Sequence, residues 1–344
     1  MGMTVQPGSV RVPTVSTPTS LSLPDSVRRS VIETRRGSFA ALEAMPGTGV
    51  CERQPAVLVP GFTGSKEDFL AILHQLGAAG RRVLAIDLRG QYQTPGPDDP
   101  AAYAVRELGA DVAAIVDAVA ARATGAASVD DAGPGGGEPA EPGPVHLVGH
   151  SFGGLVVREA LLGGAAHVGS VTFMSSGPGQ LSGPGAAELS GLVSYLDGGS
   201  PEVMRHTIEQ IWDSALGPQA VAAGIEPHIV AFLRERMLAN SPVGLQVTAQ
   251  YLLHAPDRTT ELAGHLHAPV LVLYGEEDDK WEPAAQEEMA SRLGAQRICI
   301  PAAAHSPAVD APETTASALN AFWHAAEGRP DQARQRAGHE AYRG

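Results

Sequence analysis

The chain has 344 residues, of which 43% are hydrophobic and 18% charged, and its formal net charge at pH 7 is −14. These proportions are those of a folded globular protein, and the length suits one large α/β domain or two ordinary ones. The negative charge opposes binding to phosphate backbones and to anionic membrane surfaces, so we expect neither a nucleic acid nor a membrane as a partner.

The first 28 residues are rich in Pro, Ser and Thr and contain no apolar segment typical of a signal peptide. We therefore expect a disordered extension over 1–28. Nowhere does the chain approach the roughly 18 consecutive apolar residues of a membrane span. Its two cysteines, Cys51 and Cys299, are far apart and lack metal-ligand spacing, which favours free thiols and a cytoplasmic location.

Strands and helices alternate over the next part of the chain. Residues 30–44 predict two short strands around a tight turn. The apolar run "PAVLVPG" at 55–61 is typical of a strand that is buried on both faces of a parallel sheet. Apolar residues at helical spacing predict a helix over 65–80 and another over 101–123, with a strand at 81–90 between them.

Pro, Gly and acidic residues dominate 124–144, which we interpret as a flexible surface insertion. This segment contains "GGGEPA", a formal match to the G-x-G-x-x-A loop of dinucleotide-binding proteins. Such a loop follows a strand and opens a helix, whereas this one follows a helix and precedes a strand. We therefore expect no cofactor here.

The second half of the chain contains a second set of strands, interrupted by helices alone. The predicted elements are a strand, sharp turn and helix over 144–164, a strand at 168–178, helices at 202–215, 227–240 and 242–254, a strand at 268–275, a helix at 283–295, a strand at 296–301 and a helix at 311–328. This order predicts a doubly wound, mostly parallel sheet.

The same order divides the chain into a core, an insertion and a tail. The core comprises 29–179 and 268–328, a helical cap covers 180–267, and a polar tail covers 329–344. Ligands of such sheets bind at the carboxyl ends of the strands, so the residues that follow each strand are the candidate site residues.

Ser151 stands in "GHSFG", the only G-x-S-x-G sequence of the chain, and the pattern places it between a strand and a helix. This is the context of a nucleophile elbow. Residues two before and two after the serine must be small there, or backbones collide. The helix that follows also favours negative charge near the serine. Ser151 is therefore the candidate nucleophile, although a small residue in a turn is the simpler alternative.

Several motifs together resemble the α/β-hydrolase superfamily. They are "PGFTG" at 60–64, "DLRG" after a strand, "GHSFGG", and "PVLVLYGEEDD" followed by "IPAAAHSPAVDAPE", in the order of that family and over roughly 30–325. The resemblance implies a catalytic triad in the order Ser, acid, His. The G-x-x-D spacing indicates Asp278, with Asp279 as the alternative, and the loop after the final strand supplies His305.

Serine chemistry requires the same residue types. A serine hydroxyl becomes a nucleophile when a neutral imidazole takes its proton, and a carboxylate orients that imidazole. The resemblance further implies an oxyanion hole made of the backbone N–H groups of Phe62 and Phe152. No metal or cofactor is needed.

The segment 180–267 lies where the family inserts a cap over the serine. Phe62, Trp281 and Trp212 are candidates to line the substrate pocket, although Trp212 could equally belong to the core of the cap. The apolar surroundings of the motifs favour a small or medium, largely apolar substrate.

The leading interpretation is a serine hydrolase that cleaves a carboxylic ester or lactone. Perhydrolysis or cofactor-free haloperoxidation, C–C bond hydrolysis and amide hydrolysis use the same triad and stay open, as does a binding protein without turnover. His265 and His267 lack a third ligand at metal-binding spacing, and Asp87 is interpreted as structural. The sequence does not indicate an oligomeric state.

Overall fold

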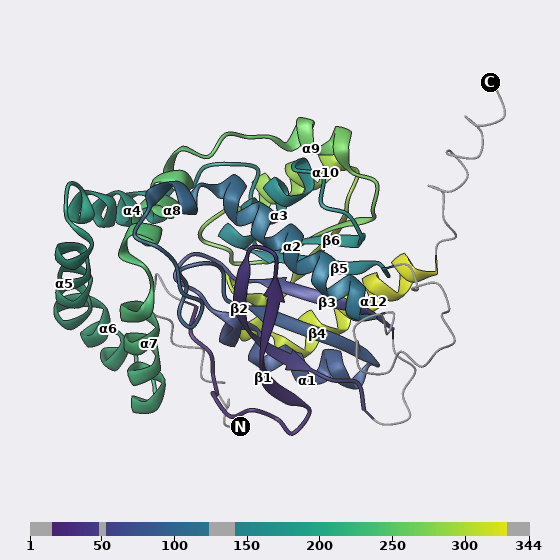
Figure 1. Cartoon of the computed structure of the whole chain (residues 1–344), viewed down its shortest axis with the longest axis horizontal. Coiled ribbons are helices and arrows are strands. Elements are labelled where there is room, and N and C mark those ends of the chain that lie inside the picture. The colour runs from purple at the N-terminus through teal and green to yellow at the C-terminus, as the bar shows by residue number, and fades with distance from the viewer. Residues whose placement is uncertain (1–15, 48–52, 124–141, 329–344) are drawn as a thin grey trace, which may run out of the picture.

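A computed structural model describes residues 16–47, 53–123 and 142–328 of the chain. Its centre is an eight-stranded sheet with the strand order β1-β2-β4-β3-β5-β6-β7-β8. The strands from β4 to β8 in this order are paired parallel. At one edge, β2 pairs antiparallel with both β4 and β1. Helices cover the sheet (Figure 1). The predicted doubly wound, mostly parallel sheet is therefore confirmed.

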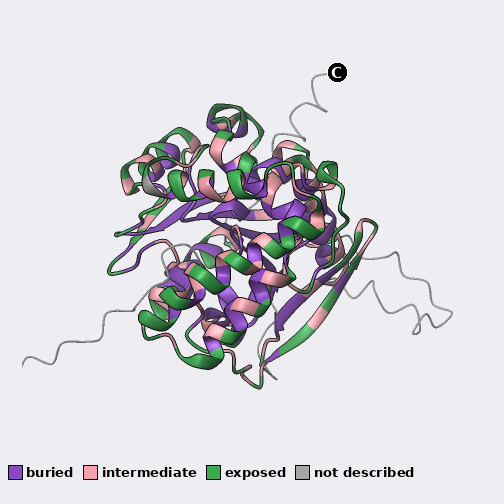
Figure 2. Ribbon diagram, turned by 90° about the vertical axis from the view of Figure 1, so that its left-hand side faces the viewer, coloured by how far each residue is buried: buried purple, intermediate pink, exposed green. Residues whose placement is uncertain are grey.

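The strands of the sheet are short, and the central ones are completely buried, as their continuous apolar sequences predict. They are β1 (Val27–Thr34), β2 (Gly37–Ala44), β3 (Arg53–Val59), β4 (Arg81–Ile86), β5 (Val145–His150), β6 (Val168–Met174), β7 (Val270–Gly275) and β8 (Gln296–Ile300). Figure 2 shows this buried centre between helices whose outer faces are exposed.

The core helices follow the strands in the predicted alternation. They are η1 (Lys66–Phe69), α1 (Leu70–Ala78), η2 (Pro100–Tyr103), α2 (Val105–Ala123), α3 (Phe152–Leu162), α10 (Pro283–Leu293), α11 (Pro307–Asp310) and α12 (Pro312–Glu327). No helix among the described residues is long and apolar enough to cross a membrane.

A separate group of helices stands to one side of the sheet, at the left of Figure 1. It contains α4 (Gly183–Leu196), α5 (Pro201–Ile211), the π-helical turn η3 (Trp212–Leu216), α6 (Gly217–Ala222), α7 (Pro227–Ala239) and α8 (Pro242–His254). We call α4 to α8 the cap. The next helix, α9 (Thr259–His265), packs against α3 and α10 of the core, although the sequence placed it within the cap segment.

The structure differs from the prediction for the N-terminal extension. Residues 16–28 have a defined course, and β1 already begins at Val27, so the predicted disorder is wrong for this part of 1–28. Four parts of the predictions lie outside the described residues: the rest of that extension, Cys51, most of the predicted insertion and the polar tail 329–344. The thiol of Cys299 is free and exposed.

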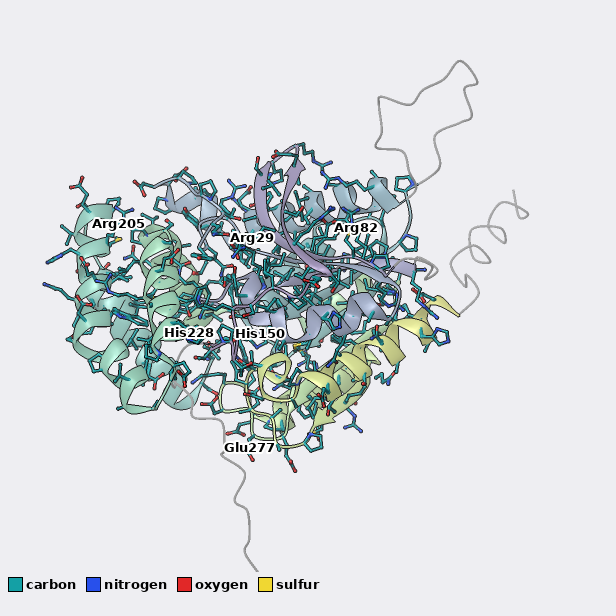
Figure 3. All side chains as sticks on the ribbon, turned by 90° about the horizontal axis from the view of Figure 1, so that it is seen from below. Arg29, Arg82, His150, Arg205, His228 and Glu277 are labelled. Carbon is teal, nitrogen blue, oxygen red and sulfur yellow. The ribbon has the colours of Figure 1, made fainter. Side chains whose placement is uncertain are left out.

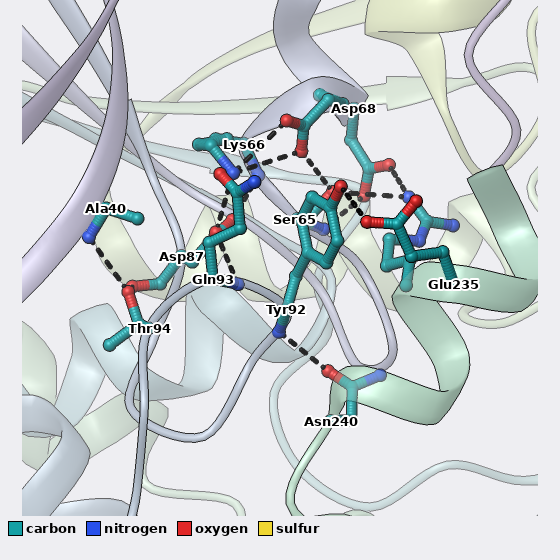
Figure 4. Close-up of polar contacts among 12 residues, drawn as sticks. Ala40, Ser65, Lys66, Asp68, Asp87, Tyr92, Gln93, Thr94, Glu235 and Asn240 are labelled. Atoms are coloured by element: carbon teal, nitrogen blue, oxygen red, sulfur yellow. Dashed lines mark hydrogen bonds and ion pairs between the residues drawn. The ribbon is translucent and has the colours of Figure 1, made fainter.

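A buried group of charged side chains joins the core to the cap (Figure 4). Lys66 Nζ lies 2.7 Å from Asp87 Oδ2, and Arg236 Nη1 on α7 lies 2.7 Å from Asp68 Oδ1. All four side chains are buried. Burial raises the pKa of Asp87 to about 6 despite the neighbouring ammonium group of Lys66. These contacts agree with the structural role expected for Asp87 and fix η1 against α7.

Candidate active site

Ser151 occupies a strained turn between β5 and α3, with φ 55° and ψ −123°. Non-glycine residues rarely adopt this conformation, and it persists where the surrounding structure enforces it. A Cβ atom at Gly149 would lie 2.5 Å from the carbonyl oxygen of Gly153, and one at Gly153 would lie 2.5 Å from that of Pro60. The expected need for small residues on both sides of the serine is confirmed.

The turn brings Ser151 to two residues that follow later strands. His305 Nε2 lies 2.9 Å from Ser151 Oγ, and His305 Nδ1 lies 2.9 Å from Asp278 Oδ1. With the proton on Nδ1, the ring donates to Asp278 and accepts from the Ser151 hydroxyl. The three side chains predicted from their positions after β5, β7 and β8 therefore form one hydrogen-bonded chain.

Asp278 is held by more than the histidine. Its Oδ1 accepts a hydrogen bond from the Lys280 N–H at 3.0 Å, and its Oδ2 accepts one from Gln286 Nε2 at 2.8 Å. Burial raises the pKa of Asp278. The hydrogen bond and charge of His305, together with these two donors, lower it by a larger amount, so the pKa lies below its usual range. Asp279, the alternative acid, is exposed and pairs with Lys280 Nζ at 3.3 Å.

Gln286 was not predicted from the sequence. It is completely buried on α10, where it shares the inward face with Met289 and Ala290. An amide on the buried side of an otherwise apolar helix face was the available signal, because a buried polar group requires a partner. That partner is Asp278, eight residues earlier in the chain.

The loop after β3 lies directly against the serine. A Cβ atom at Gly61 would lie 3.0 Å from Ser151 Cβ, which shows how closely the backbone approaches. Phe152 is the first residue of α3, so its N–H has no acceptor within the helix. Gln91 Nε2 donates to the Gly61 carbonyl at 2.9 Å, and its Oε1 accepts from the Leu88 N–H. A residue to which the sequence assigned no role thus fixes this loop.

His150, next to the serine, is a second support that the sequence did not indicate. Its Nε2 donates to the carbonyl of His305 at 2.7 Å, which holds the loop that carries His305. Burial and the neighbouring His305 lower the pKa of His150 to about 4. The ring is therefore neutral at pH 7. Because a neutral imidazole carries one proton and a carbonyl can only accept, this proton is on Nε2.

The depressed pKa of His150 predicts a pH-dependent stability. A histidine in the unfolded chain binds a proton near pH 6.5, whereas buried His150 binds one near pH 4, so the unfolded state holds more protons between these values. Stability from this group is present above pH 6.5 and is lost as the pH falls towards 4, by about 3 kcal/mol. Urea unfolding at pH 7, 5.5 and 4 measures this loss. His150→Gln should show a shallower decline than the parent chain, and equal declines would contradict the assignment.

A cavity of about 1210 Å³ opens above the serine, between the core and the cap. Ser151, His150 and His305 lie at its base, and Figure 3 shows His150 at the boundary between the green cap helices and the core. The cap contributes mainly apolar side chains, among them Leu189, Leu192, Ile211, Leu216, Ile229 and Met237. Such a lining suits the apolar part of a ligand.

Of the three aromatic residues predicted to line the substrate pocket, one does so. Phe62 lines the cavity, while Trp212 and Trp281 do not. The ring of Trp212 is buried inside the cap, against Gly217, as the alternative interpretation had it. Trp281 is buried behind the site, with its ring 6.2 Å from that of His305 and its Nε1 donating to the Gly179 carbonyl. Its large ring supports the histidine loop instead of facing the ligand.

The alpha/beta hydrolase family matches residues 56–318, which is more than half of the chain. The chain belongs to this family. The resemblance seen in the motifs is therefore confirmed, and this alpha/beta hydrolase also shares its fold with solved esterases. A thermophilic esterase from Thermogutta terrifontis superposes with a TM-score of 0.62 and 21% identity, covering 87% of this chain and 99% of the esterase.

Two curated relatives are similar over shorter stretches. "Putative carbamate hydrolase RutD" of Variovorax paradoxus (strain S110) is 30% identical over 128 residues, which are 37% of this chain and 40% of that protein. "Putative protein-lysine deacylase ABHD14B" of Rattus norvegicus is 37% identical over 90 residues, 26% of this chain and 43% of that protein. The matches thus span less than half the length of each relative.

Proposed function

We propose that this alpha/beta hydrolase is a serine hydrolase that cleaves a carboxylic ester or lactone of a small to medium, largely apolar substrate. The observation that carries the proposal is the hydrogen-bonded chain from Ser151 through His305 to Asp278. It provides a nucleophile, a base within hydrogen-bond reach and a carboxylate that orients the base. A small-molecule substrate and a cytoplasmic location belong to the same proposal.

The reaction follows from the positions of these groups. Ser151 Oγ attacks the substrate carbonyl while His305 Nε2 takes its proton, and Asp278 stabilises the imidazolium that forms. The N–H groups of Phe62 and Phe152 hold the oxyanion, since Gly61, the residue before Phe62, lies against Ser151 and Phe152 directly follows the serine. The proton then passes to the leaving oxygen, and water hydrolyses the acyl-enzyme by the same route.

The cavity supports the substrate class. Its volume of about 1210 Å³ leaves room for a medium-sized acyl group, and the cap lines it with mainly aliphatic side chains. Burial of an apolar acyl chain contributes about 0.8 kcal/mol per methylene group. A medium-length acyl chain is therefore favoured over an acetyl group.

Amide or carbamate hydrolysis is the second candidate, because the names of the two curated relatives describe C–N bond cleavage. The same Ser151, His305 and Asp278 would act in it, with His305 protonating a leaving nitrogen in place of oxygen. Perhydrolysis, haloperoxidation and C–C cleavage also use a triad of this kind, and no described residue favours them.

Hydrolysis of 4-nitrophenyl esters of graded chain length tests the proposal, with lactones and an anilide of the best acyl group as comparisons. The hexanoyl ester carries four more methylene groups than the acetyl ester, and their full burial in the cavity contributes about 3 kcal/mol, so we expect kcat/KM to rise by about 200-fold. Faster cleavage of the anilide would favour the second candidate. Absence of turnover with every ester and lactone would contradict the leading proposal.

A further inference from the structure

Residues 16–19 form one wall of the active-site cavity. Ser16, Thr17, Pro18 and Thr19 all line it, and Pro18 is buried. We call these four residues the N-terminal wall. We propose that the N-terminal wall binds a polar leaving group, so that the substrate is an ester of an apolar acyl group with a hydroxyl-bearing alcohol. This inference rests on the proposed esterase function.

The N-terminal wall is held in place from two sides. Arg236 Nη2 donates to the Ser16 carbonyl at 2.6 Å, while Arg236 Nη1 is bound to Asp68 at 2.7 Å. The Ser306 hydroxyl donates to Ser16 Oγ at 3.4 Å. Further along the chain, Leu21 packs against the main hydrophobic core. The wall is thus fixed both to the cap and to the loop that carries His305, and can hold a ligand in a defined position.

The position of the wall decides which part of the ester it meets. When the tetrahedral intermediate collapses, the bond from the carbonyl carbon to the leaving oxygen breaks, and that oxygen takes the proton from His305 Nε2. The leaving group must therefore lie on the His305 side of Ser151. Ser306 follows His305 directly and contacts Ser16, which places the N-terminal wall on this side.

The chemistry of the wall differs from that of the cap. Three of its four residues carry hydroxyl groups, and Ser306, which also lines the cavity, adds a fourth. The cap, in contrast, lines its part of the cavity mainly with aliphatic side chains. Hydroxyl groups both donate and accept hydrogen bonds, so they suit the hydroxyls of an alcohol such as a polyol. A site that hydrogen-bonds a substrate hydroxyl discriminates strongly against an analogue that lacks it.

The test compares two esters with one acyl group and different alcohols, glycerol monobutanoate and butyl butanoate, by titrating the acid released. We expect the parent chain to prefer the glycerol ester in kcat/KM by about tenfold or more. Ser16→Ala and Thr17→Val should each lower that preference by about 3- to 10-fold, because each removes hydroxyl hydrogen bonds. Thr314→Val, on the exposed face of α12, is the matched control and should keep the preference of the parent.

Turnover of 4-nitrophenyl butanoate separates the two levels of the inference. If the parent chain hydrolyses this ester but shows no preference between the two alcohols, the N-terminal wall does not bind the leaving group. The same conclusion holds if Ser16→Ala and Thr17→Val both keep the preference of the parent. If the parent hydrolyses none of these three esters and none of the graded esters and lactones, the proposed esterase function itself fails.

Discussion

Replacement of Ser151 by alanine should lower kcat for the best ester by a factor of about 10⁶. The alanine leaves the backbone N–H groups of Phe62 and Phe152 and the apolar cavity in place, so the chain should still bind substrate. It removes the hydroxyl that His305 is placed to activate, since Ser151 Oγ lies 2.9 Å from His305 Nε2. Turnover of a 4-nitrophenyl ester in the two proteins measures the loss.

Labelling with a fluorophosphonate provides the second measurement of this prediction. The reagent reacts with an activated serine, so we expect the parent chain to be labelled and Ser151→Ala to stay unlabelled. Ser291→Ala, in the last turn of α10 and exposed, is the matched control and should be labelled like the parent. Equal labelling of Ser151→Ala and the parent would show that another residue is the nucleophile.

The strands and the positions of the site residues could be predicted because they depend on local patterns. β5 and β7 are buried on both faces, and their continuous apolar runs show it. The turns that follow them have short motifs with steric causes, such as the glycines around Ser151. The order of Ser151, Asp278 and His305 was implied by the resemblance of these motifs to the α/β-hydrolase superfamily.

The cap was predicted less completely. Helix α4 was missed because Gly, Pro and Ser are frequent in it and have low helix propensity. Its apolar residues Leu189, Leu192 and Leu196 nevertheless follow helical spacing, and α4 packs against α8. Tertiary packing thus stabilises a helix that its composition disfavours.

The residues that support the site could not be predicted from local patterns. Each of these residues acts through a partner in another element. His150 bonds the carbonyl of His305 and Gln91 that of Gly61, both distant in the sequence, while Gln286 on α10 bonds the carboxylate of Asp278 in the preceding loop. The N-terminal wall is a similar case, since a segment rich in Ser, Thr and Pro has no apolar periodicity. A buried arginine on α7 gives it a defined position.

Replacement of Asp278 by asparagine should lower kcat by a factor of about 10⁴, while Asp279→Asn should leave it within about twofold of the parent. The asparagine cannot accept from His305 Nδ1 with its amide nitrogen, and the ring then takes the tautomer that cannot accept the Ser151 proton. Asp279 is exposed and contacts Lys280, so its neutral form leaves His305 unchanged.

The acidic run "YGEEDDKWEP" therefore contains one carboxylate with a proposed part in the chemistry, and the structure explains the choice. Asp278 is buried and receives hydrogen bonds from the Lys280 N–H and Gln286, which leaves its Oδ1 directed at His305. Glu276 and Glu277 are exposed. Steady-state kinetics of the two asparagine variants decide between the neighbours. A large loss in Asp279→Asn together with normal turnover in Asp278→Asn would move the acid by one residue and leave the fold and the nucleophile unaffected.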